Sequence, residues 1–546
     1  MNLPNELQEL IEGEVKTDEK TLEEYSTDYS IFKIKPSTVI FPKNTRDVER
    51  LVSYVTEKKK QGESVSLTAR SAGTDMSGGP LNDSIIIEFT KYINSLREIG
   101  NDYAIVEPGL YYRDFEVELD KCGLLYPPYP ASKDLCAMGG IVNNNSGGEG
   151  TLEYGKTEKY VEEVSVVLAD GKEHTLKPLS GDLLKQKLQE QGFEGDLYRK
   201  LYKLLEDNYE DIQAAKPKVS KNSAGYGLWN VWDKKTFDIG QLIVGSQGTL
   251  GMMMSAKLRL VKKHIHSGLV VVFSNSLKPV PDFVKDILSL NPESIESYDD
   301  KTLRFAMRFF PSLLKLMKGS IITLFFKFLP EFLMVLKGGM PKMVLLVSFT
   351  SDNKNEVDEN LKKTLEIAKN YPVQVHRIKD ENEAQKYWTI RRQSFSLLHG
   401  HAKGMYAAAF IDDVIVDPKY MPEFLPKVNA ILEEHKDKFI YTIAGHPGNG
   451  NFHIIPLIKL DDEETIKLLV PIMDKVYALV SQYNGSITAE HNDGLIRTPY
   501  LRGMYGDKII GFFEEVKNIF DPEGIFNPHK KVGSTLEYAF KHLRSK

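Results

Sequence analysis

The sequence predicts an α+β protein of more than one domain, and three observations support this. The chain has 546 residues, and this length suggests three to four domains or two large ones. Hydrophobic residues make up 41% of the chain, enough for sizeable buried cores, and charged residues make up an ordinary 27%. Short β-branched runs alternate with helical segments along most of the sequence, as expected where helices pack on sheets.

These patterns divide the chain into four parts. Residues 1–32 are polar and helix-prone, so we expect a helical cap at the N-terminus. Residues 33–263 alternate strand-like and helical runs, which predicts a first α+β domain. Residues 264–500 predict a second α+β domain that begins with a strand at 267–276. Residues 501–546 form a C-terminal segment.

Two short segments near the C-terminus gather candidate metal ligands. AGHPGNGNFH places His446 and His453 seven residues apart around a glycine-rich turn, and GSITAEHNDGL adds Glu490 and His491. Imidazoles and a carboxylate suit a zinc-like divalent cation that keeps one position open for substrate. The glycines of the turn would let both imidazoles converge. Each histidine could instead be an ordinary loop residue, but three of the chain's twelve histidines lie in these two segments.

Three loops of small residues lie next to strand-like sequence. They are RSAGTDMSGG (70–79), GGIVNNNSGG (139–148) and VGSQGTLG (244–251). Such loops present backbone N–H groups at close range, which suits a diphosphate. The sequence has no G-x-G-x-x-G after the first strand and no G-x-x-x-x-G-K-[ST], so neither a Rossmann dinucleotide site nor a P-loop is predicted.

Composition argues against several other classes of protein. A net charge of −6, with no aromatic RNA-binding signature, argues against a nucleic-acid-binding protein. Cys122 and Cys136 are too few for a disulfide framework or an iron–sulfur cluster. The acidic N-terminus MNLPNELQELIEGEV lacks the apolar core of a signal peptide, so we expect a cytoplasmic location.

In one order from about residue 33 to 531, these motifs resemble those of a known flavoprotein superfamily. RSAGTDMSGG, VEPGL, PPYPASKDLCAMGGIVNNNSGG, VVLADG and VGSQGTLG are similar to the PCMH-type FAD-binding domain of the vanillyl-alcohol oxidase and p-cresol methylhydroxylase superfamily. GHPGNGNFH, GSITAEHNDGL and FDPEGIFNP resemble its FAD-linked D-2-hydroxyacid dehydrogenase branch, which includes D-lactate, glycolate and D-2-hydroxyglutarate dehydrogenases. The resemblance implies two α+β subdomains that bind FAD, an α+β FAD-linked oxidase C-terminal domain for substrate, and a tail that returns to the flavin domain.

The resemblance also implies which residues bind FAD. They lie in the three small-residue loops, in the segments around residues 108 and 130, in a Tyr-Gly pair and in the C-terminal tail. The expected FAD-binding residues are Arg70, Ser71, Ala72, Gly73, Thr74, Ser77, Gly78, Pro108, Gly109, Pro130, Met138, Gly139, Gly140, Asn143, Asn145, Ser146, Gly148, Tyr154, Gly155, Gly245, Gly248, Thr249, Gly251 and Asn527. Covalent members often attach the flavin through a His in the first loop. Thr74 stands near that place, so we expect non-covalent FAD.

The implied reaction is oxidation of a small D-2-hydroxy acid to the 2-oxo acid by hydride transfer to flavin N5. A divalent metal, expected to be zinc, would be held by His446, His453 and Glu490 and would lower the pKa of the substrate hydroxyl. His491 would take the hydroxyl proton as general base. Arg391 matches the arginine that holds the substrate carboxylate, although its neighbour Arg392 competes for this role. Electrons would pass to a quinone or an electron-transfer protein.

The sequence departs from the family pattern in several places. Asn449 replaces the usual Asp, Asn492 replaces Gly, and Gln247 replaces Glu. None of these changes removes a predicted ligand, but Asn449 lacks a charge that could orient His446. Two other functions stay open: a flavin-dependent transferase of the ether-lipid synthase type, and a flavin-binding module without catalysis. The His-x6-His spacing with the Glu-His pair favours the dehydrogenase.

One segment is unusual for a globular protein. Residues 301–342 carry eight Lys or Arg and a single acid, Glu331, among many Phe, Leu, Ile and Met residues. Charges and Pro330 interrupt every window long enough to span a bilayer, so a transmembrane helix is not predicted. A basic, apolar, helix-prone segment suggests peripheral attachment to the inner face of a membrane. The alternative is a pair of helices that pack on the second domain.

Overall fold

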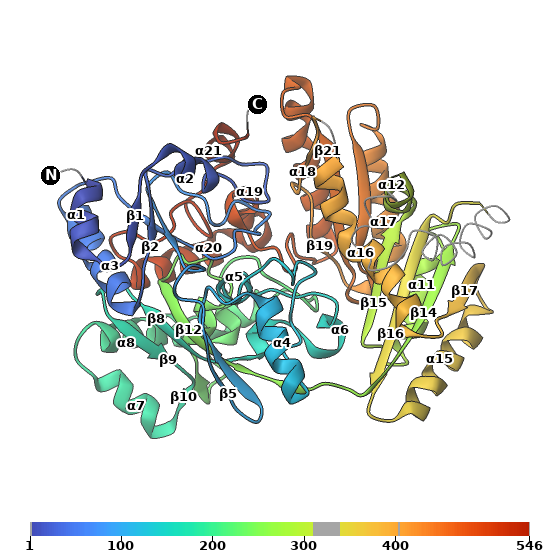
Figure 1. Ribbon diagram of the computed structural model, residues 1–546, viewed down its shortest axis with the longest axis horizontal. Coiled ribbons are helices and arrows are strands. Elements are labelled where there is room, and N and C mark those ends of the chain that lie inside the picture. Colours follow the sequence, from blue (N-terminus) through green and yellow to red (C-terminus); the bar gives the residue numbers. More distant parts are fainter. Residues whose placement is uncertain (1–2, 309–338, 402–403, 545–546) are drawn as a thin grey trace.

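The computed structural model describes residues 3–308, 339–401 and 404–544 and has two halves that lie side by side (Figure 1). The first half, blue to green, carries the smaller sheets and is joined by the red C-terminal segment. The second half, yellow to orange, is built on one large sheet. This arrangement confirms the predicted α+β fold class.

The first half contains a four-stranded and a five-stranded sheet. The four-stranded sheet has the order β1 (Glu14–Lys16), β2 (Thr38–Phe41), β4 (Ile85–Glu88) and β3 (Leu67–Arg70). The five-stranded sheet has the order β5 (Leu96–Ile99), β6 (Tyr103–Val106), β12 (Met252–Arg259), β8 (Val161–Val167) and β9 (Glu173–Leu176). The helices around them include α3 (Thr45–Lys60), α4 (Tyr112–Cys122), α5 (Met138–Asn144), α8 (Phe193–Asp207) and α10 (Gly240–Ile243).

The N-terminal segment is not the purely helical cap that its composition predicts. Helices α1 (Leu3–Leu10) and α2 (Glu19–Glu24) form, but β1 lies between them and pairs antiparallel with β2. The side chain of Asp47 fixes this segment, because its carboxylate accepts hydrogen bonds from the backbone N–H groups of Glu12 (2.9 Å) and Gly13 (3.0 Å). The segment is therefore part of the four-stranded sheet.

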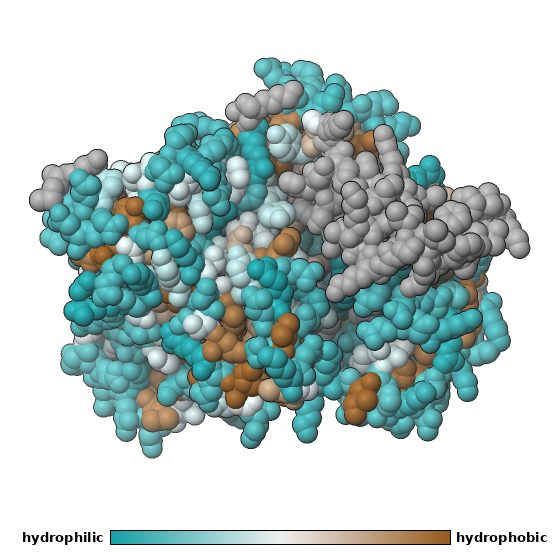
Figure 2. Space-filling model, viewed as in Figure 1, coloured by the Kyte–Doolittle hydropathy of each residue, from teal (hydrophilic) through white to brown (hydrophobic). Residues whose placement is uncertain are grey.

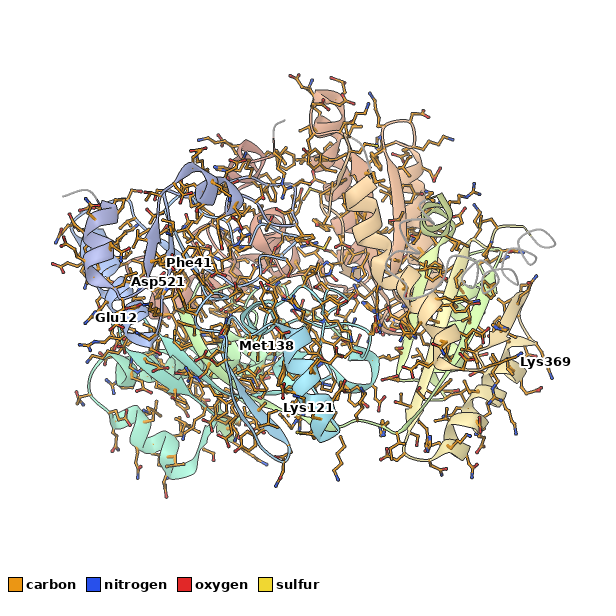
Figure 3. All side chains as sticks on the ribbon, viewed as in Figure 1. Glu12, Phe41, Lys121, Met138, Lys369 and Asp521 are labelled. Carbon is orange, nitrogen blue, oxygen red and sulfur yellow. The ribbon has the colours of Figure 1, made fainter. Side chains whose placement is uncertain are left out.

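The predicted loop 139–148 also differs from expectation. Its first half is helix α5, which begins at Met138, and only the residues after Asn144 form a loop. Met138, labelled in Figure 3, is fully buried and anchors the start of this short helix in the core. A Cβ at Gly139 would lie 2.5 Å from Oγ of Ser71. Glycine at this position therefore lets α5 approach the 70–79 loop closely.

The second half is an eight-stranded sheet with helices on both faces. Its order is β17 (Val373–Arg377), β14 (His266–Ser274), β16 (Met343–Ser351), β15 (Ser294–Asp299), β20 (Ile440–His446), β21 (Asn451–Ile458) and β18 (Tyr406–Ala407), with β19 (Val414–Ile415) also paired to β21. Helices α11 (Val280–Leu288), α15 (Lys354–Ala368), α17 (Met421–Glu433) and α18 (Glu463–Gln482) pack together, whereas α12 (Asp300–Arg308) contacts α16 (Glu381–His401).

Apolar side chains of β14 point alternately to the two faces of the large sheet, which explains why helices cover both faces. Val270 and Val272 join the core beneath α11 and α15, whereas Leu269, Val271 and Phe273 join a separate cluster with Tyr387 and Ile390 of α16. Successive side chains of a strand point to opposite faces, so a strand buried on both faces reads as a continuous apolar run. The α16 face also carries the candidate site.

The chain returns to the first half earlier than residue 501. Gly494 N–H donates to Oε1 of Gln247 (2.9 Å), and Leu495 N–H donates to the carbonyl of Ser77 (2.8 Å). Further along, after α20 (Leu501–Phe520), Asn527 donates to the carbonyls of Gly79 (3.0 Å) and Gln247 (2.6 Å). The segment after α18 therefore brings Glu490 and His491 to the boundary between the halves.

The surface shown in Figure 2 is mostly hydrophilic, with an apolar area over the lower part of the first half. Val117 on α4 and Leu135 are among the exposed large apolar side chains. Most of the basic segment 301–342 lies outside the described residues, which include only 301–308 and 339–342 of it. Across the described parts of the chain, no helix combines the length and apolarity needed to cross a membrane.

Candidate active site

The hairpin of β20 and β21 brings His446 and His453 to one face of the large sheet. Ala444 pairs with His453, and His446 pairs with Asn451, so the two histidines are diagonal neighbours. Of the two glycines in the turn, only Gly450 has a positive φ (+73°). The other glycine required here is Gly445, where φ is +148° and a Cβ would lie 2.4 Å from the carbonyl oxygen of Asn451.

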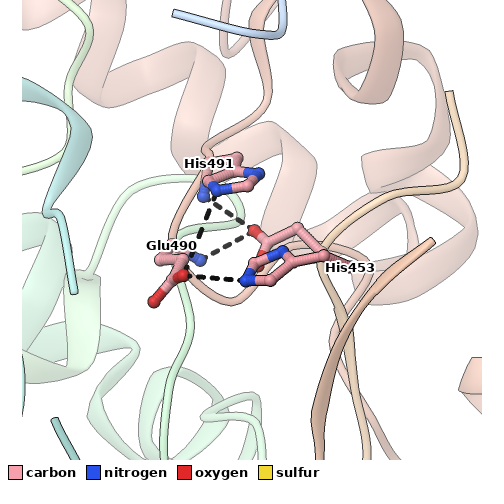
Figure 4. Close-up of side chains that lie close together, drawn as sticks. His453, Glu490 and His491 are labelled. Carbon is pink, nitrogen blue, oxygen red and sulfur yellow. Dashed lines mark hydrogen bonds and ion pairs between the residues drawn. The ribbon is translucent and has the colours of Figure 1, made fainter. Parts of the chain in front are cut away.

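Three donor atoms converge at this hairpin. Nε2 of His446 lies 3.1 Å from Oε1 of Glu490 and 3.2 Å from Nε2 of His453. Oε1 of Glu490 and Nε2 of His453 are also 3.2 Å apart. Figure 4 shows His453 and Glu490 facing each other, with His491 beside them. Tetrahedral zinc with bonds of about 2.0–2.1 Å spaces its ligand atoms by about 3.3–3.4 Å. The donor set and its spacing therefore fit a divalent cation.

Carboxylates orient both imidazoles from behind. Nδ1 of His446 lies 2.5 Å from Oε1 of Glu296, and Nδ1 of His453 lies 3.2 Å from Oδ1 of Asp412. A carboxylate at Nδ1 fixes the ring and leaves Nε2 to bind a metal. Burial opposes the charge on His453, but Asp412 and Glu490 outweigh it and raise its pKa to about 10. A cation bound here would therefore displace a proton.

Asp413 organises the segment that carries Glu490 and His491. Asp413, His453, Glu490 and His491 each offer one candidate ligand atom, and these atoms all lie within 4.8 Å of one another; His446 is not in this group. Oδ2 of Asp413, however, accepts hydrogen bonds from the backbone N–H groups of Glu490 (2.8 Å) and His491 (2.7 Å) and from the hydroxyl of Thr488 (2.7 Å). These hydrogen bonds show that Asp413 holds the loop in place.

His491 lies next to the three donors with one nitrogen turned toward them. Its Nδ1 is 2.6 Å from Oδ2 of Asp412, and its Nε2 is 4.0 Å from Oε1 of Glu490. The ring stacks on His453 with centroids 4.8 Å apart. Burial lowers the pKa of His491, but Asp413 and Asp412 outweigh it, so the pKa is raised overall. Asp412 thus connects a candidate ligand with the candidate base.

A buried lysine binds the second oxygen of Glu490. Nζ of Lys221 is 3.2 Å from Oε2 of Glu490 and 3.4 Å from Oδ1 of Asn451, and its side chain is fully buried. Burial would raise the pKa of Glu490, but Lys221 and His446 hold it well below its usual range. Because Lys221 occupies Oε2, Oε1 is the oxygen left for a cation.

Sequence reasoning missed Glu296, Asp412, Asp413 and Lys221. Two adjacent acids inside the apolar run AAAFIDDVIV were a usable signal, because buried carboxylates need a partner. Glu296 in the fully buried strand β15 gave the same kind of signal, once its burial was known. Lys221 gave none.

Arg391 and Arg392 both reach the cavity, and each binds a carboxylate. Nε and Nη2 of Arg391 lie 3.1 and 3.0 Å from Oε2 of Glu296. Nε and Nη2 of Arg392 each lie 2.7 Å from an oxygen of Glu149. Glu296 therefore links Arg391 to His446, whereas Arg392 is tied to the 145–150 loop of the first half.

A cavity of about 350 Å³ lies between the halves and is lined by His453, Glu490, His491 and both arginines. Several predicted FAD-binding residues also line it: Ser71, Ala72, Gly73, Thr74, Pro108, Pro130, Gly139, Gly140, Asn143, Ser146, Gly248 and Gly251. The other predicted residues are not among those that line it: Arg70, Ser77, Gly78, Gly109, Met138, Asn145, Gly148, Tyr154, Gly155, Gly245, Thr249 and Asn527.

The bare backbone of the wall fits a bound cofactor. Gly140 lines the cavity, and a Cβ there would meet no atom within 4 Å, so the peptide faces open space. A Cβ at Gly148, which does not line the cavity, would lie 2.0 Å from the carbonyl oxygen of Tyr129. The backbone at Gly140 can therefore approach a ligand such as a flavin diphosphate, whereas Gly148 lets its loop pack closely against the backbone of Tyr129.

Comparison with protein families agrees with this geometry. Residues 264–531 match the family described as FAD linked oxidases, C-terminal domain, and residues 36–177 match the FAD binding domain. The chain belongs to the FAD-linked oxidases. The family resemblance seen in the sequence motifs is thereby confirmed, as is the presence of a domain that binds FAD.

Curated relatives of this family member are dehydrogenases and an oxidase subunit. D-2-hydroxyglutarate dehydrogenase of Pseudomonas putida is 27% identical over 95% of this chain and 50% of the relative. The enzyme of the same name from Stutzerimonas stutzeri is 26% identical over 97% and 98%, and D-lactate dehydrogenase of Anaerostipes hadrus is 25% identical over 91% and 90%. The chain spans about half the length of several of these relatives.

Solved structures of the superfamily share the fold. 4-Ethylphenol oxidase from Gulosibacter chungangensis aligns with a TM-score of 0.69 at 16% identity, covering 98% of each chain. p-Cresol methylhydroxylase aligns with a TM-score of 0.64 at 15% identity, covering 96% of this chain and 94% of the other. These likenesses confirm the PCMH-type fold.

Proposed function

We propose that this FAD-linked oxidase family member oxidises a D-2-hydroxy acid to the 2-oxo acid. The observation that carries the proposal is the convergence of Nε2 of His446, Nε2 of His453 and Oε1 of Glu490, with His491 4.0 Å away, at the wall of the FAD-domain cavity. The names of the curated relatives support the same reaction class.

His446, His453 and Glu490 would hold a divalent cation, expected to be zinc, that supplies a Lewis acid for the substrate hydroxyl and carboxylate. Glu296, Asp412 and Lys221 keep these three side chains in position. Because the carboxylates fix each Nδ1 and Lys221 takes Oε2 of Glu490, the donor atoms that remain all point to one place.

His491 is assigned the role of general base. With Nδ1 donating to Asp412, Nε2 carries the lone pair and can take the hydroxyl proton. The electron pair of that O–H bond then forms the C=O bond as the C2–H bond breaks and its hydrogen leaves as hydride. FAD, when bound, is the hydride acceptor, and the 70–79 loop offers Thr74 but no histidine for a covalent link.

Arg391 is assigned to the substrate carboxylate. Its guanidinium lines the cavity and is oriented by Glu296, the carboxylate that also orients His446. Arginine suits this role because its planar N–H groups match a carboxylate. The electron acceptor in turn is proposed to be a quinone or an electron-transfer protein, with the basic segment 301–342 as the contact to a membrane surface.

Anaerobic mixing of the FAD-loaded protein with D- and L-2-hydroxy acids tests the reaction class. We expect flavin bleaching with D-isomers only. Failure of every 2-hydroxy acid to bleach the flavin, in protein that contains FAD and metal, would refute the proposal and favour a transferase or a flavin-binding module without catalysis.

A further inference from the structure

The hairpin that carries His446 and His453 changes from polar to apolar with distance from its turn. On the cavity-facing side, Ala444 is paired with His453, and the next pair outward is Thr442 with Ile455. All four of these residues line the cavity. Because alternate residues of a strand share a face, the Ala444–His453 pair and the Thr442–Ile455 pair form one continuous wall of the cavity.

A side chain of the flavin domain closes the apolar end of this wall. Met76, in the 70–79 loop, lines the cavity and packs against the cluster formed by Ile455, Leu457 and Ala407. Ala407 pairs with Leu457 in the sheet, and Met405 completes the cluster. The end of the cavity beyond His453 is therefore bounded by aliphatic and thioether groups from both halves.

The charges around the cavity do not favour a second carboxylate at this end. Among the described residues that line the cavity, the Lys and Arg side chains are Arg391 and Arg392, which bind Glu296 and Glu149. The charged neighbour of Met76 is an acid, Asp75, whose carboxylate accepts hydrogen bonds from Ser77 and Gln247. A buried carboxylate without a cation carries a large desolvation penalty.

We infer that the substrate's side chain, from C3 outward, is aliphatic and lies against Thr442, Ile455 and Met76. This inference rests on the proposed function, because the proposed function places the substrate's hydroxyl and C1 carboxylate at His446, His453, Glu490 and His491. Monocarboxylic 2-hydroxy acids with an unbranched or branched alkyl chain fit this wall. Dicarboxylic ones of the same length do not, which separates this chain from relatives named for 2-hydroxyglutarate.

The test compares D-2-hydroxyvalerate with D-2-hydroxyglutarate, which have the same number of carbons. The rate of flavin reduction in the holoenzyme, divided by the dissociation constant, should be at least about tenfold higher for hydroxyvalerate, since only one of the two buries a second charge. From D-lactate to D-2-hydroxyvalerate this ratio should rise about fourfold for each methylene that is buried. Equal or better use of hydroxyglutarate would overturn the inference.

Two variants at one position sharpen this comparison. Ile455→Lys adds a cation at the apolar end and should reduce the preference for hydroxyvalerate over hydroxyglutarate by about tenfold or more. Ile455→Ala is the matched control: it should weaken hydroxyvalerate use without a gain for hydroxyglutarate. Flavin content and the Tm of each variant show whether it folds. An unchanged preference in folded Ile455→Lys would contradict the placement of the side chain.

Binding of the oxidised products separates this inference from the proposed function. 2-Oxovalerate should perturb the spectrum of the oxidised flavin at concentrations at least about tenfold lower than 2-oxoglutarate. Discrimination between the oxo acids without flavin reduction by any hydroxy acid would leave the apolar pocket standing and refute the reaction. Flavin reduction by hydroxy acids, without discrimination between the two oxo acids, would support the proposed reaction and refute the apolar pocket.

Discussion

Nδ1 of His491 lies 2.6 Å from Oδ2 of Asp412, while the other oxygen of Asp412 lies 3.2 Å from Nδ1 of His453. One carboxylate therefore positions both the proposed base and a proposed metal ligand. A single change in Asp412 would disturb both functions, whereas a change in His491 disturbs only one. This difference allows the roles of the histidines to be separated.

His491→Ala should retain metal and FAD but slow flavin reduction by D-2-hydroxy acids by about 10²–10⁴-fold, the usual contribution of a positioned base. Anaerobic stopped-flow absorbance gives the rate, and elemental analysis gives the metal content. Asp412→Asn is the comparison, and it should lower both the rate and the metal content. Loss of metal from His491→Ala would make His491 a ligand and reopen the assignment of the base.

His446→Ala, His453→Ala and Glu490→Ala should each lose the metal and most turnover while keeping FAD. The three donors are mutually 3.1–3.2 Å apart, so removing one leaves too few ligands to compete with water. Metal content is measured after dialysis, with His264→Ala, a histidine outside the cluster, as the control. Full activity of a metal-free preparation would contradict this prediction.

FAD should be released as the free dinucleotide when the protein is precipitated with acid. The 70–79 loop contains no histidine, and Thr74 lines the cavity without a side chain suited to the usual covalent link. The absorbance of the supernatant and of the redissolved pellet gives the partition. Flavin that stays with the precipitated chain would rule out non-covalent binding.

Asp299 should make the stability of the second half depend on pH. Burial raises its pKa from 3.8 to about 6, although its carboxylate accepts backbone hydrogen bonds from Thr302 and Ile443. The folded state therefore prefers the neutral acid, so this contribution to stability is fully present below about pH 4 and is lost as the pH rises through about 6.

Between about pH 5 and about pH 7.5, the wild type should lose on the order of 1 kcal/mol of unfolding free energy relative to Asp299→Asn. Thermal or urea unfolding of both proteins across this range measures the difference. The comparison removes pH effects common to both proteins. Parallel pH profiles for the two proteins would show that Asp299 does not titrate as its burial implies.

The basic segment 301–342 should bind anionic vesicles, with an affinity that falls as salt is added. Each Lys or Arg near such a surface contributes about 1 kcal/mol. Replacing Phe325, Phe326 and Leu329 with Ser should release the protein from sedimenting vesicles without loss of FAD, because no residue of the segment is assigned to FAD or metal. Failure of the intact protein to sediment with anionic vesicles at low salt would refute membrane attachment.

The family resemblance and the fold class could be predicted from the sequence alone, as could the four residues His446, His453, Glu490 and His491, which lie close together in the structure. The motifs predicted to bind FAD are local runs of small residues, so they can be recognised without knowledge of distant contacts. His446 and His453 are also local, because the short turn between β20 and β21 and the two-residue alternation of a strand place them on one face. Glu490 and His491 were predicted as site residues from the separate motif GSITAEHNDGL.

The contacts that hold those residues in place became visible only in the folded structure. Glu296 contacts His446 across 150 positions of sequence, and Lys221 contacts Glu490 across 269. The folded structure also decided that residues 138–144 form a helix and that β1 joins the first sheet. The apolar wall at Ile455 and Met76 likewise needs both halves. Contacts between segments so far apart depend on how sheets and loops pack, and this packing leaves no periodic pattern in the sequence.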